Sequence, residues 1–372
     1  MGLVSSPTQT NLQIMNKKIL EKLVSFNTIS DQSNLDLIEY VKKRLGRSGY
    51  NFIVQKFGNK ANLFVFKNTT NPRIIFSSHT DTVPNSIEWR SNPFILTQKS
   101  NRYFGLGVSD MKTQVAISIG LLEKFKKLDN LAILLTFNEE TDFAGAKKID
   151  SGIIGKNDTI IIGEPTSGRA IFETKGLASF KIIFNCPGGH GSEPKNKMSA
   201  IIQCVDFIGK LSRKFDNFAN HSRNNFFENP LPTINFGKIA GGDAPNKIAQ
   251  KCELIFEVRY CNDGQLDKID SIIKTCIKSL KTKLEILEIA RPFKSSDFIK
   301  SKFSKTPCAR GVSFATEASI FQDLCKNIII LGPGDLSQAH KPNESIDVKG
   351  ITNYQWNIEE VIKTSCQELD IF

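Results

Sequence analysis

The sequence predicts an α/β protein in which a small domain interrupts a larger one. At 372 residues, the chain is longer than the size at which one hydrophobic core stops growing, so two domains are expected. Short segments that are apolar throughout, as in strands buried on both faces, alternate with helical segments in the first part of the chain. Near Lys175 the strands begin to alternate polar and apolar residues, which indicates a sheet with one exposed face.

The larger domain is expected to contain a mixed, largely parallel sheet. Apolar residues recur at helical spacing in residues 12–26, 35–45 and 111–125. The segments that are apolar throughout are residues 63–66, 74–76, 131–137, 159–162 and 328–331. Because helical segments separate strands of this buried type, the sheet is expected to have parallel character.

The smaller domain is expected to be an inserted ferredoxin-like α+β sandwich. Its segments are typical of strand, helix, strand, strand, helix and strand: residues 178–184, 198–214, 233–236, 252–260, 266–280 and 284–287. This is the split β-α-β order of that sandwich. The chain therefore divides into a larger domain of residues 1–174 and 290–372 and an inserted domain of residues 175–289.

Composition argues against several classes of protein. The net charge of +11 comes from lysines that are dispersed among acids, and there is no nucleic-acid-binding motif, so no nucleic-acid partner is expected. The eight cysteines include no C-x-x-C pair, which indicates reduced thiols in a cytoplasmic protein. No apolar run is long enough to cross a bilayer, so no membrane partner is expected.

Histidines and acids follow the predicted buried strands or open a helix. These residues are His79, Asp110, Glu139, Glu140, Glu164 and His340. Open α/β sheets place their sites at the carboxyl ends of strands, so these side chains are expected to meet at one edge of the sheet. Histidine is the commonest metal ligand in proteins. Two histidines and three carboxylates would supply two metal ions that share one carboxylate, which leaves one glutamate free.

Each of these features alone has an ordinary structural explanation. A histidine after a strand is usually held by a structural hydrogen bond, and a pair of glutamates usually lies in a solvated loop. The segment Gly163-Glu164-Pro165-Thr166 fits a simple turn. Five independent coincidences at strand ends favour a functional site over these explanations.

The motifs around these residues resemble those of the M20-type metallopeptidases and deacylases. The matching segments occur in the order of that family and span almost the whole chain: residues 78–84, 110–112, 139–140, 163–166 and 175–176. Three further segments are similar to the acetylornithine deacetylase branch of the family: residues 241–246, 316–319 and 332–344.

The resemblance implies a centre that holds two Zn²⁺ per subunit, for which Co²⁺ can substitute. His79 and Glu164 would bind one ion. Glu140 and His340 would bind the other, with Asp110 as a bridge between the two ions.

The resemblance also implies catalytic roles beside the metal ligands. Glu139 would act as the general base, and Asp81 would fix the tautomer of His79 through a hydrogen bond. The inserted domain forms the dimer interface in this family, so a homodimer is implied. His190 would then stabilise the oxyanion in the active site of the partner subunit.

Two residues of the inserted domain would contact the substrate. Arg259 would pair with the substrate carboxylate, and Asn246 would lie near the substrate. On its own, His190 equally fits a turn with a structural hydrogen bond, and Arg259 fits a charge on the surface of a strand. Three sites depart from the common pattern of the family: Asn138, Thr113, and Gly191 with Ser192.

Together these features predict a dinuclear zinc amidohydrolase that removes an acyl group from an N-acyl amino acid. The favoured substrate is N²-acetyl-L-ornithine, which would place the enzyme in arginine biosynthesis. The alternatives are a related deacylase acting on succinyl-diaminopimelate, acetylcitrulline or general N-acyl amino acids, and a dipeptidase. A catalytically inactive relative that only binds a ligand is disfavoured, because all five candidate ligands and the candidate base are present.

Overall fold

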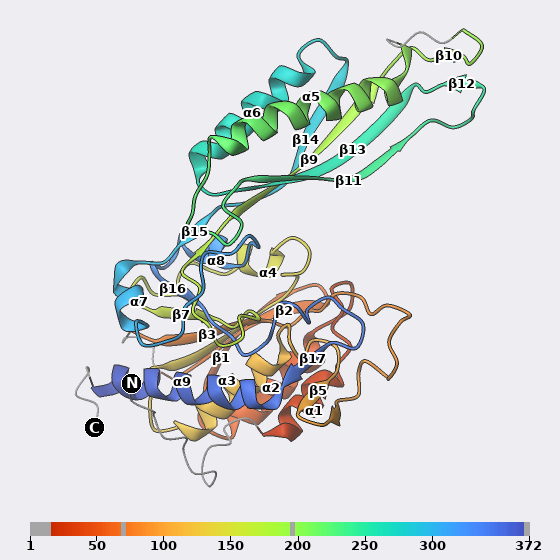
Figure 1. Ribbon diagram of the computed structural model, residues 1–372. Helices are drawn as coiled ribbons and strands as arrows, with labels where there is room; N and C mark the ends of the chain where they lie inside the picture. The colour runs from red at the N-terminus through yellow and green to blue at the C-terminus, as the bar shows by residue number, and fades with distance from the viewer. Residues whose placement is uncertain (1–15, 68–71, 194–197, 368–372) are drawn as a thin grey trace. The chain divides into compact units, whose positions relative to one another are not determined.

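A computed structural model describes residues 16–67, 72–193 and 198–367 (Figure 1). These residues form two compact units. Unit 1 comprises the described residues through Ile171, the segment Ser295–Ala309 and the described residues from Ile320 onward. Unit 2 comprises Phe172–Lys294 and Arg310–Ser319.

Unit 1 contains a six-stranded sheet in the order β1-β2-β6-β3-β7-β16. The strands are β1 (Asn51–Phe57), β2 (Lys60–Phe66), β3 (Ile74–His79), β6 (Leu131–Thr136), β7 (Thr159–Ile162) and β16 (Asn327–Ile330). Neighbouring strands from β6 to β16 run parallel, whereas β1 and β2 form an antiparallel hairpin and β2 is antiparallel to β6. The predicted mixed α/β fold with a largely parallel sheet is confirmed.

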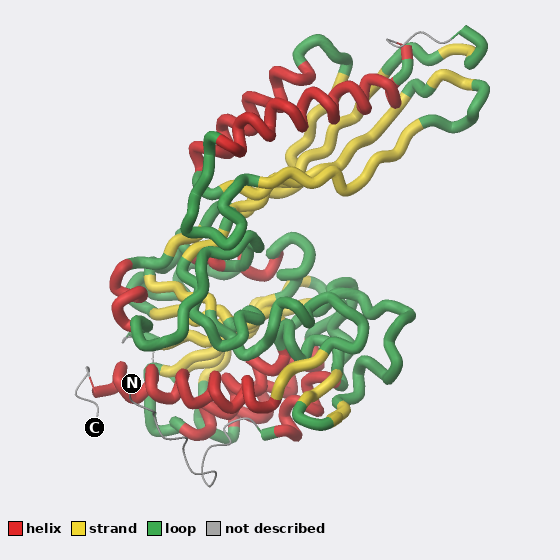
Figure 2. The backbone as a smooth tube through the Cα atoms, in the orientation of Figure 1, coloured by secondary structure: helices red, strands yellow, loops and turns green. Residues whose placement is uncertain are grey.

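Helices cover the sheet of unit 1 and explain why its central strands are apolar throughout. Every residue of β3, β6 and β7 is buried. Helix α3 (Lys112–Lys124) contacts β3 and β6, and it also contacts α1 (Lys17–Val24) and α2 (Leu35–Gly46). Figures 1 and 2 show these helices with α9 (Val348–Gln367) on one side of the sheet. Residues 12–15 of the first predicted helix lie outside the described residues.

Shorter elements complete unit 1. They are α4 (Ala144–Lys147), α7 (Asp297–Lys302) and a small sheet in the order β17-β5-β4, formed by β17 (Ser345–Asp347), β5 (Arg102–Phe104) and β4 (Thr97–Lys99). Helix α8 (Ala318–Phe321) begins in unit 2 and ends in unit 1. None of the described helices is long and apolar enough to span a membrane.

Unit 2 has the predicted order of strand, helix, strand, strand, helix and strand. These elements are β9 (Gly176–Asn185), α5 (Ala200–Asn220), β11 (Thr233–Gly241), β13 (Lys251–Tyr260), α6 (Asp263–Ile277) and β14 (Thr282–Ala290). The strands pair in the antiparallel order β11-β13-β9-β14, and both helices lie on one face of the sheet (Figure 1). Inward-facing Phe180 and Phe256 stack on each other, and Phe207 of α5 packs against Phe256.

Residues 310–319 group with unit 2, although the sequence analysis places them in the larger domain. The backbone N–H of Val312 donates to Glu173 O at 3.1 Å, and the N–H of Lys175 donates to Val312 O at 2.9 Å. Val312 thus lies beside the short strand β8 (Glu173–Thr174), which also pairs with β15 (Phe293–Lys294). The pairing joins segments that are distant in sequence, so no local pattern predicts it.

A buried ion pair fixes the amino ends of two neighbouring strands in unit 1. Arg73 precedes β3 and Asp158 precedes β7. Their side chains are 6% and 3% exposed, and Arg73 Nη2 lies 2.6 Å from Asp158 Oδ2. The backbone N–H groups of Arg73 and Gly155 also donate to this carboxylate, at 2.8 and 2.7 Å. Asp158 therefore stabilises the sheet at the edge opposite to the carboxyl ends of its parallel strands.

Replacing Asp158 by Asn should lower the free energy of unfolding by about 3–5 kcal/mol, because Arg73 would keep a buried charge without its counter-charge. Urea denaturation followed by circular dichroism measures this change. The matched control is Glu39→Gln, which breaks the exposed pair of Glu39 with Lys42 and should cost about 0–1 kcal/mol. Equal losses in the two variants would contradict the role assigned to Asp158.

Candidate metal centre

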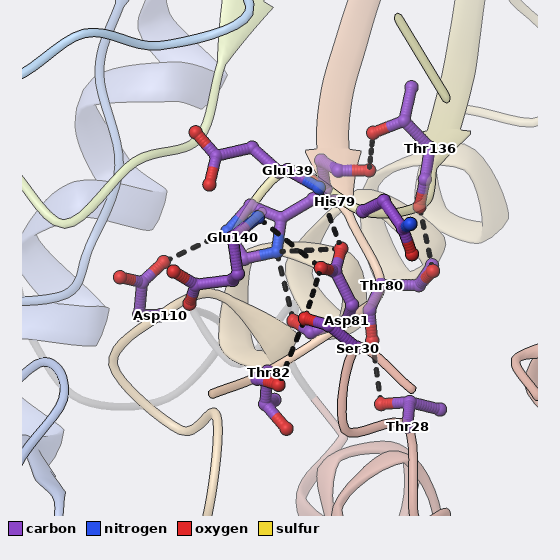
Figure 3. Close-up of polar contacts among 12 residues, drawn as sticks. Thr28, Ser30, His79, Thr80, Asp81, Thr82, Asp110, Thr136, Glu139 and Glu140 are labelled. Carbon is purple, nitrogen blue, oxygen red and sulfur yellow. Dashed lines mark hydrogen bonds and ion pairs between the residues drawn. The ribbon is translucent and has the colours of Figure 1, made fainter. Parts of the chain in front are cut away.

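The carboxyl ends of the parallel strands bring the predicted site residues of unit 1 together. Figure 3 shows four of them, His79, Asp110, Glu139 and Glu140. His79 is the last residue of β3, Glu139 and Glu140 follow β6, and Glu164 follows β7. The loop before α3 carries Asp110, and the loop after β16 carries His340. Because neighbouring parallel strands end at the same edge of a sheet, residues far apart in sequence meet here.

Asp110 lies between the two histidines. Its Oδ1 is 3.0 Å from His79 Nε2, and its Oδ2 is 3.5 Å from His340 Nε2. On the other side, His340 Nε2 is 2.9 Å from Glu140 Oε2. One carboxylate thus offers a different oxygen to each imidazole, which is the arrangement that a bridging ligand between two cations requires.

The spacing of the donor atoms fits metal coordination. Ligand atoms of His79, Glu139 and Glu164 lie within 4.8 Å of one another, and so do those of His79, Asp110 and Glu140. Nitrogen and oxygen ligands lie about 2.0–2.2 Å from a zinc ion in tetrahedral geometry, so two ligand atoms of one ion are about 3.4 Å apart. Small movements of the side chains would bring each group to coordination distance.

The cluster is buried on one side and exposed to solvent on the other. His79, Glu164 and Asp110 are 1%, 5% and 8% exposed. Glu139 is half-buried, and the side chain of His340 is 53% exposed. Solvent therefore reaches the cluster at His340 and Glu139, whereas His79, Glu164 and Asp110 are shielded from it.

Negative charge predominates in this cluster and perturbs its titration. Burial raises the pKa of Glu139 well above its ordinary value, and the nearby Glu164 carboxylate adds to the rise. Burial also raises the pKa of Glu140, and the Asp110 carboxylate acts in the same direction. Four carboxylates gather around two imidazoles, so the residues present fit a site for cations.

The same carboxylates hold protons on the histidines. Burial opposes the charged form of His79, but its hydrogen bond to Asp110 and the charge of Glu139 raise its pKa well above the usual range. Hydrogen bonds to Asp110 and Glu140 raise the pKa of His340 to about 10. These protons occupy the nitrogen lone pairs that a metal ion would take.

Asp81 contacts His79 through a different atom from the one expected. His79 Nδ1 lies 2.9 Å from the backbone oxygen of Asp81, whereas its distance to the carboxylate Oδ1 is 3.7 Å. In the neutral imidazole, donation to this carbonyl places the proton on Nδ1 and leaves Nε2 free to face Asp110. The tautomer is therefore fixed by the main chain of Asp81.

The carboxylate of Asp81 instead holds the loop that carries the paired glutamates (Figure 3). The backbone N–H of Glu139 donates to Oδ1 at 3.1 Å, and that of Glu140 donates to Oδ2 at 3.3 Å. The hydroxyl of Ser30 donates to Oδ2 at 2.8 Å. Asp81 thus connects the end of β3 to the loop after β6.

Asn138, which departs from the family pattern, supports the same loop. Its φ of 58° lies in the left-handed region, which asparagine adopts more readily than most residues. Its Oδ1 accepts a hydrogen bond from Lys60 Nζ, which also donates to the backbone oxygen of Ser30. An uncharged side chain therefore orients the turn immediately before Glu139.

Glu344 ends the segment of residues 332–344 and is a residue of the site whose role is not predicted from the sequence. It is 3% exposed, and its carboxylate accepts from the backbone N–H groups of Gly107, Ser109 and Asp110. Burial raises its pKa to about 8, although these three hydrogen bonds act in the opposite direction. Its position four residues after His340 is the one local signal for a role in the site.

Thr113, another departure from the family pattern, is the second residue of α3 and contacts the loop that precedes this helix. Its hydroxyl donates to Val108 O at 2.5 Å. The side chain therefore satisfies a backbone carbonyl of the loop that carries Asp110.

The remaining predicted site residues belong to unit 2. His190 lies on the short strand β10 (Gly189–His190), which pairs with β12 (Lys247–Ile248) next to Asn246. The N–H of Gly191 donates to Asn246 O at 2.8 Å, so the structure brings these two predicted residues together. The exposed ring of His190 places Nδ1 2.7 Å from Ser192 Oγ.

Arg259 lies on β13 and already has partners within unit 2. Its Nη2 lies 3.0 Å from Glu257 Oε1, and its Nη1 donates to Ser313 O at 3.5 Å. Both side chains of the ion pair are partly exposed. The guanidinium group is therefore accessible to solvent as well as paired.

The fold and the donor set define a class of protein: an α/β protein with a candidate metal site at the carboxyl edge of a largely parallel sheet. The profile of peptidase family M20/M25/M40 matches residues 75–361. The chain belongs to this peptidase family and is therefore a hydrolase.

Relatives along the full length of the chain share one name. The acetylornithine deacetylase of Photorhabdus laumondii is 32% identical, over 95% of this chain and 97% of the relative. That of Proteus mirabilis is also 32% identical, over 91% of this chain and 92% of the relative.

Solved structures with the same fold are more distant in sequence. A tripeptidase from Staphylococcus aureus has a TM-score of 0.75 at 20% identity, over 95% of this chain and all of that chain (100%). The aminopeptidase PepT from Bacillus cereus has a TM-score of 0.73 at 20% identity, over 94% and 98% of the two chains. At this identity the similarity shows the fold alone.

In the metal-free protein, His340 should remain protonated at pH 8, because Asp110 and Glu140 stabilise its charged form and raise its pKa to about 10. Proton NMR of the imidazole signals between pH 6 and 11 measures this pKa. Glu140→Gln removes one of the two negative partners, so it should shift the midpoint down toward the ordinary value of about 6.5. A wild-type midpoint near 6.5 would contradict the arrangement.

Proposed function

We propose that this protein is a dinuclear zinc enzyme that hydrolyses N²-acetyl-L-ornithine to L-ornithine and acetate, a step of arginine biosynthesis. The observation that carries the proposal is the position of Asp110 between His79 and His340, with glutamates on both sides. The substrate is supported by the relatives that bear the name acetylornithine deacetylase and align over nearly their full length.

The proposed ligands divide into two groups around Asp110. His79 and Glu164 would hold one ion, and Glu140 and His340 would hold the other. When bound, two such ions supply a nucleophilic water at neutral pH and polarise the amide carbonyl. Co²⁺ would be accepted in place of Zn²⁺, because nitrogen and oxygen ligands of this type bind both ions.

Glu139 is the proposed general base. Its carboxylate lies in the same group of donor atoms as His79 and Glu164, on the open side of the cluster. The burial that raises its pKa makes it a stronger base than an ordinary glutamate. It would take the proton of the attacking water and then deliver it to the amine nitrogen as the C–N bond breaks.

Unit 2 would provide a dimer interface and contacts to the substrate. We assign it the role of an inserted ferredoxin-like dimerisation domain. Exposed apolar side chains on its edge strands and on α5 support this role: Ile239, Ile286, Leu287 and Val205 are 49–55% exposed. Burying such side chains against a second subunit would remove apolar surface from water.

Three residues of unit 2 would act on the substrate. His190, exposed on β10, would stabilise the oxyanion in the partner subunit's active site. Arg259 would pair with the carboxylate of the amino acid, and Asn246, next to His190 in space, would lie near the substrate.

The purified protein should release amine from N²-acetyl-L-ornithine faster than from succinyl-diaminopimelate, acetylcitrulline, N-acetylmethionine or dipeptides. A chelator should abolish turnover, and Zn²⁺ or Co²⁺ should restore it. Elemental analysis should find about two metal ions per chain. A protein that binds no metal would overturn the metal centre, whereas a preference for dipeptides would overturn only the proposed substrate.

Replacing Glu139 by Gln should lower kcat by about 10²–10⁴-fold, because the amide cannot accept the proton of water. The metal content should stay at the wild-type value, since Glu139 is proposed as a base and not as a ligand. The control Asp142→Asn changes an exposed carboxylate of the same loop and should leave kcat unchanged. Full activity in Glu139→Gln would show that another group is the base.

A further inference from the structure

The strongest feature left without a function is the carboxylate of Glu344. Its Oε1 accepts from the backbone N–H groups of Ser109 and Asp110, at 2.6 and 3.0 Å. Its Oε2 accepts from the N–H of Gly107 at 2.7 Å. At 3% exposure, these hydrogen bonds are protected from water, so each stabilises the loop more than an exposed hydrogen bond would.

The loop of residues 105–111 is shaped to present these N–H groups to one anion. Successive backbone N–H groups that converge in this way form an anion-binding concavity. Gly107 has a φ of 81°, and a Cβ at this position would lie 2.8 Å from Thr82 Cγ2 and 3.0 Å from Lys112 Cδ. A side chain at position 107 would therefore disturb the conformation that directs this N–H toward Glu344.

A second contact connects the same two segments of chain. Ser109 Oγ accepts from the N–H of Asp335 at 2.8 Å and donates to Asp335 O at 3.0 Å. Gly334 lies so close that a Cβ on it would be 2.0 Å from Ser109 O. Asp335 precedes His340 in the loop after β16 and Glu344 follows it, so the two contacts lie on either side of His340.

We propose that Glu344 is a positioning residue, which fixes the main chain of Asp110 and so sets the separation of Asp110 from His340. Asp110 offers one oxygen to each histidine. Both contacts form only if the position and orientation of its main chain are fixed. Glu344 holds the N–H of Asp110 itself, from the loop that carries His340. This inference rests on the proposed metal centre.

The variant Glu344→Gln tests the proposal in the full-length protein. The amide keeps one acceptor oxygen but turns an N–H group toward a backbone donor of the loop. After removal of metal, titration with Zn²⁺ should show affinity lower by about 10–100-fold, as for other groups that orient ligands. Hydrogen exchange of the metal-free protein should also become faster at Gly107, Ser109 and Asp110.

Glu359→Gln is the matched control. Glu359 is likewise buried, at 4% exposure, but its carboxylate pairs with Lys124 and Lys363. This variant should keep the zinc affinity of the wild type and the exchange rates of residues 107–110, even where it lowers the melting temperature. The control therefore distinguishes a general loss of stability from a displacement of Asp110.

The outcomes are distinct. If Glu344→Gln binds Zn²⁺ within twofold of the wild type and the exchange of residues 107–110 does not change, the proposal is overturned. If that variant does not fold, Glu344→Asp, which keeps the carboxyl group on a shorter side chain, decides in the same way. Failure of the wild type to hydrolyse N-acyl amino acids would overturn the proposed substrate, but the zinc and exchange measurements would still test Glu344.

Discussion

The structure of unit 1 depends on holding like charges together at the edge of a sheet. Asp110, Glu139, Glu140 and Glu164 converge on two imidazoles. Moving an ionised carboxylate out of water costs several kcal/mol, and nearby carboxylates repel one another. The raised pKa values of Glu139 and Glu140 show this cost in the metal-free protein. A cluster of this composition is stable as ionised ligands only when cations offset its charge.

Two further acids, Asp81 and Glu344, bind backbone N–H groups and are not proposed as metal ligands. Asp81 accepts from the N–H groups of Glu139 and Glu140, and Glu344 accepts from the loop that carries Asp110. Hydrogen bonds therefore hold each ligand-bearing loop to a buried carboxyl group from another segment, so the repelling carboxylates cannot move apart freely.

The sequence predicts which site residues lie at the carboxyl ends of parallel strands. The apolar segment 131–137 and the segment 159–162 are short and continuous, which indicates parallel strands, and acids after such strands meet at one edge. The contacts of Asp81 and Glu344 could not be predicted, because their partners are backbone N–H groups that leave no pattern in the sequence. The pairing of Val312 with Glu173 and Lys175 is equally hidden, since it joins segments from opposite sides of the inserted domain.

The proposed enzyme must both cleave the amide bond and select the amino-acid side chain, and these two tasks require different residues. The cluster acts on a C–N bond that all N-acyl amino acids and peptides share, so its residues alone cannot select ornithine. In the proposed function, Arg259 would recognise the substrate carboxylate; its partner in this structure is the carboxylate of Glu257. A partly exposed ion pair of this kind contributes only about 0–1 kcal/mol. Exchanging the Glu257 carboxylate for that of a substrate at Arg259 would therefore cost little free energy.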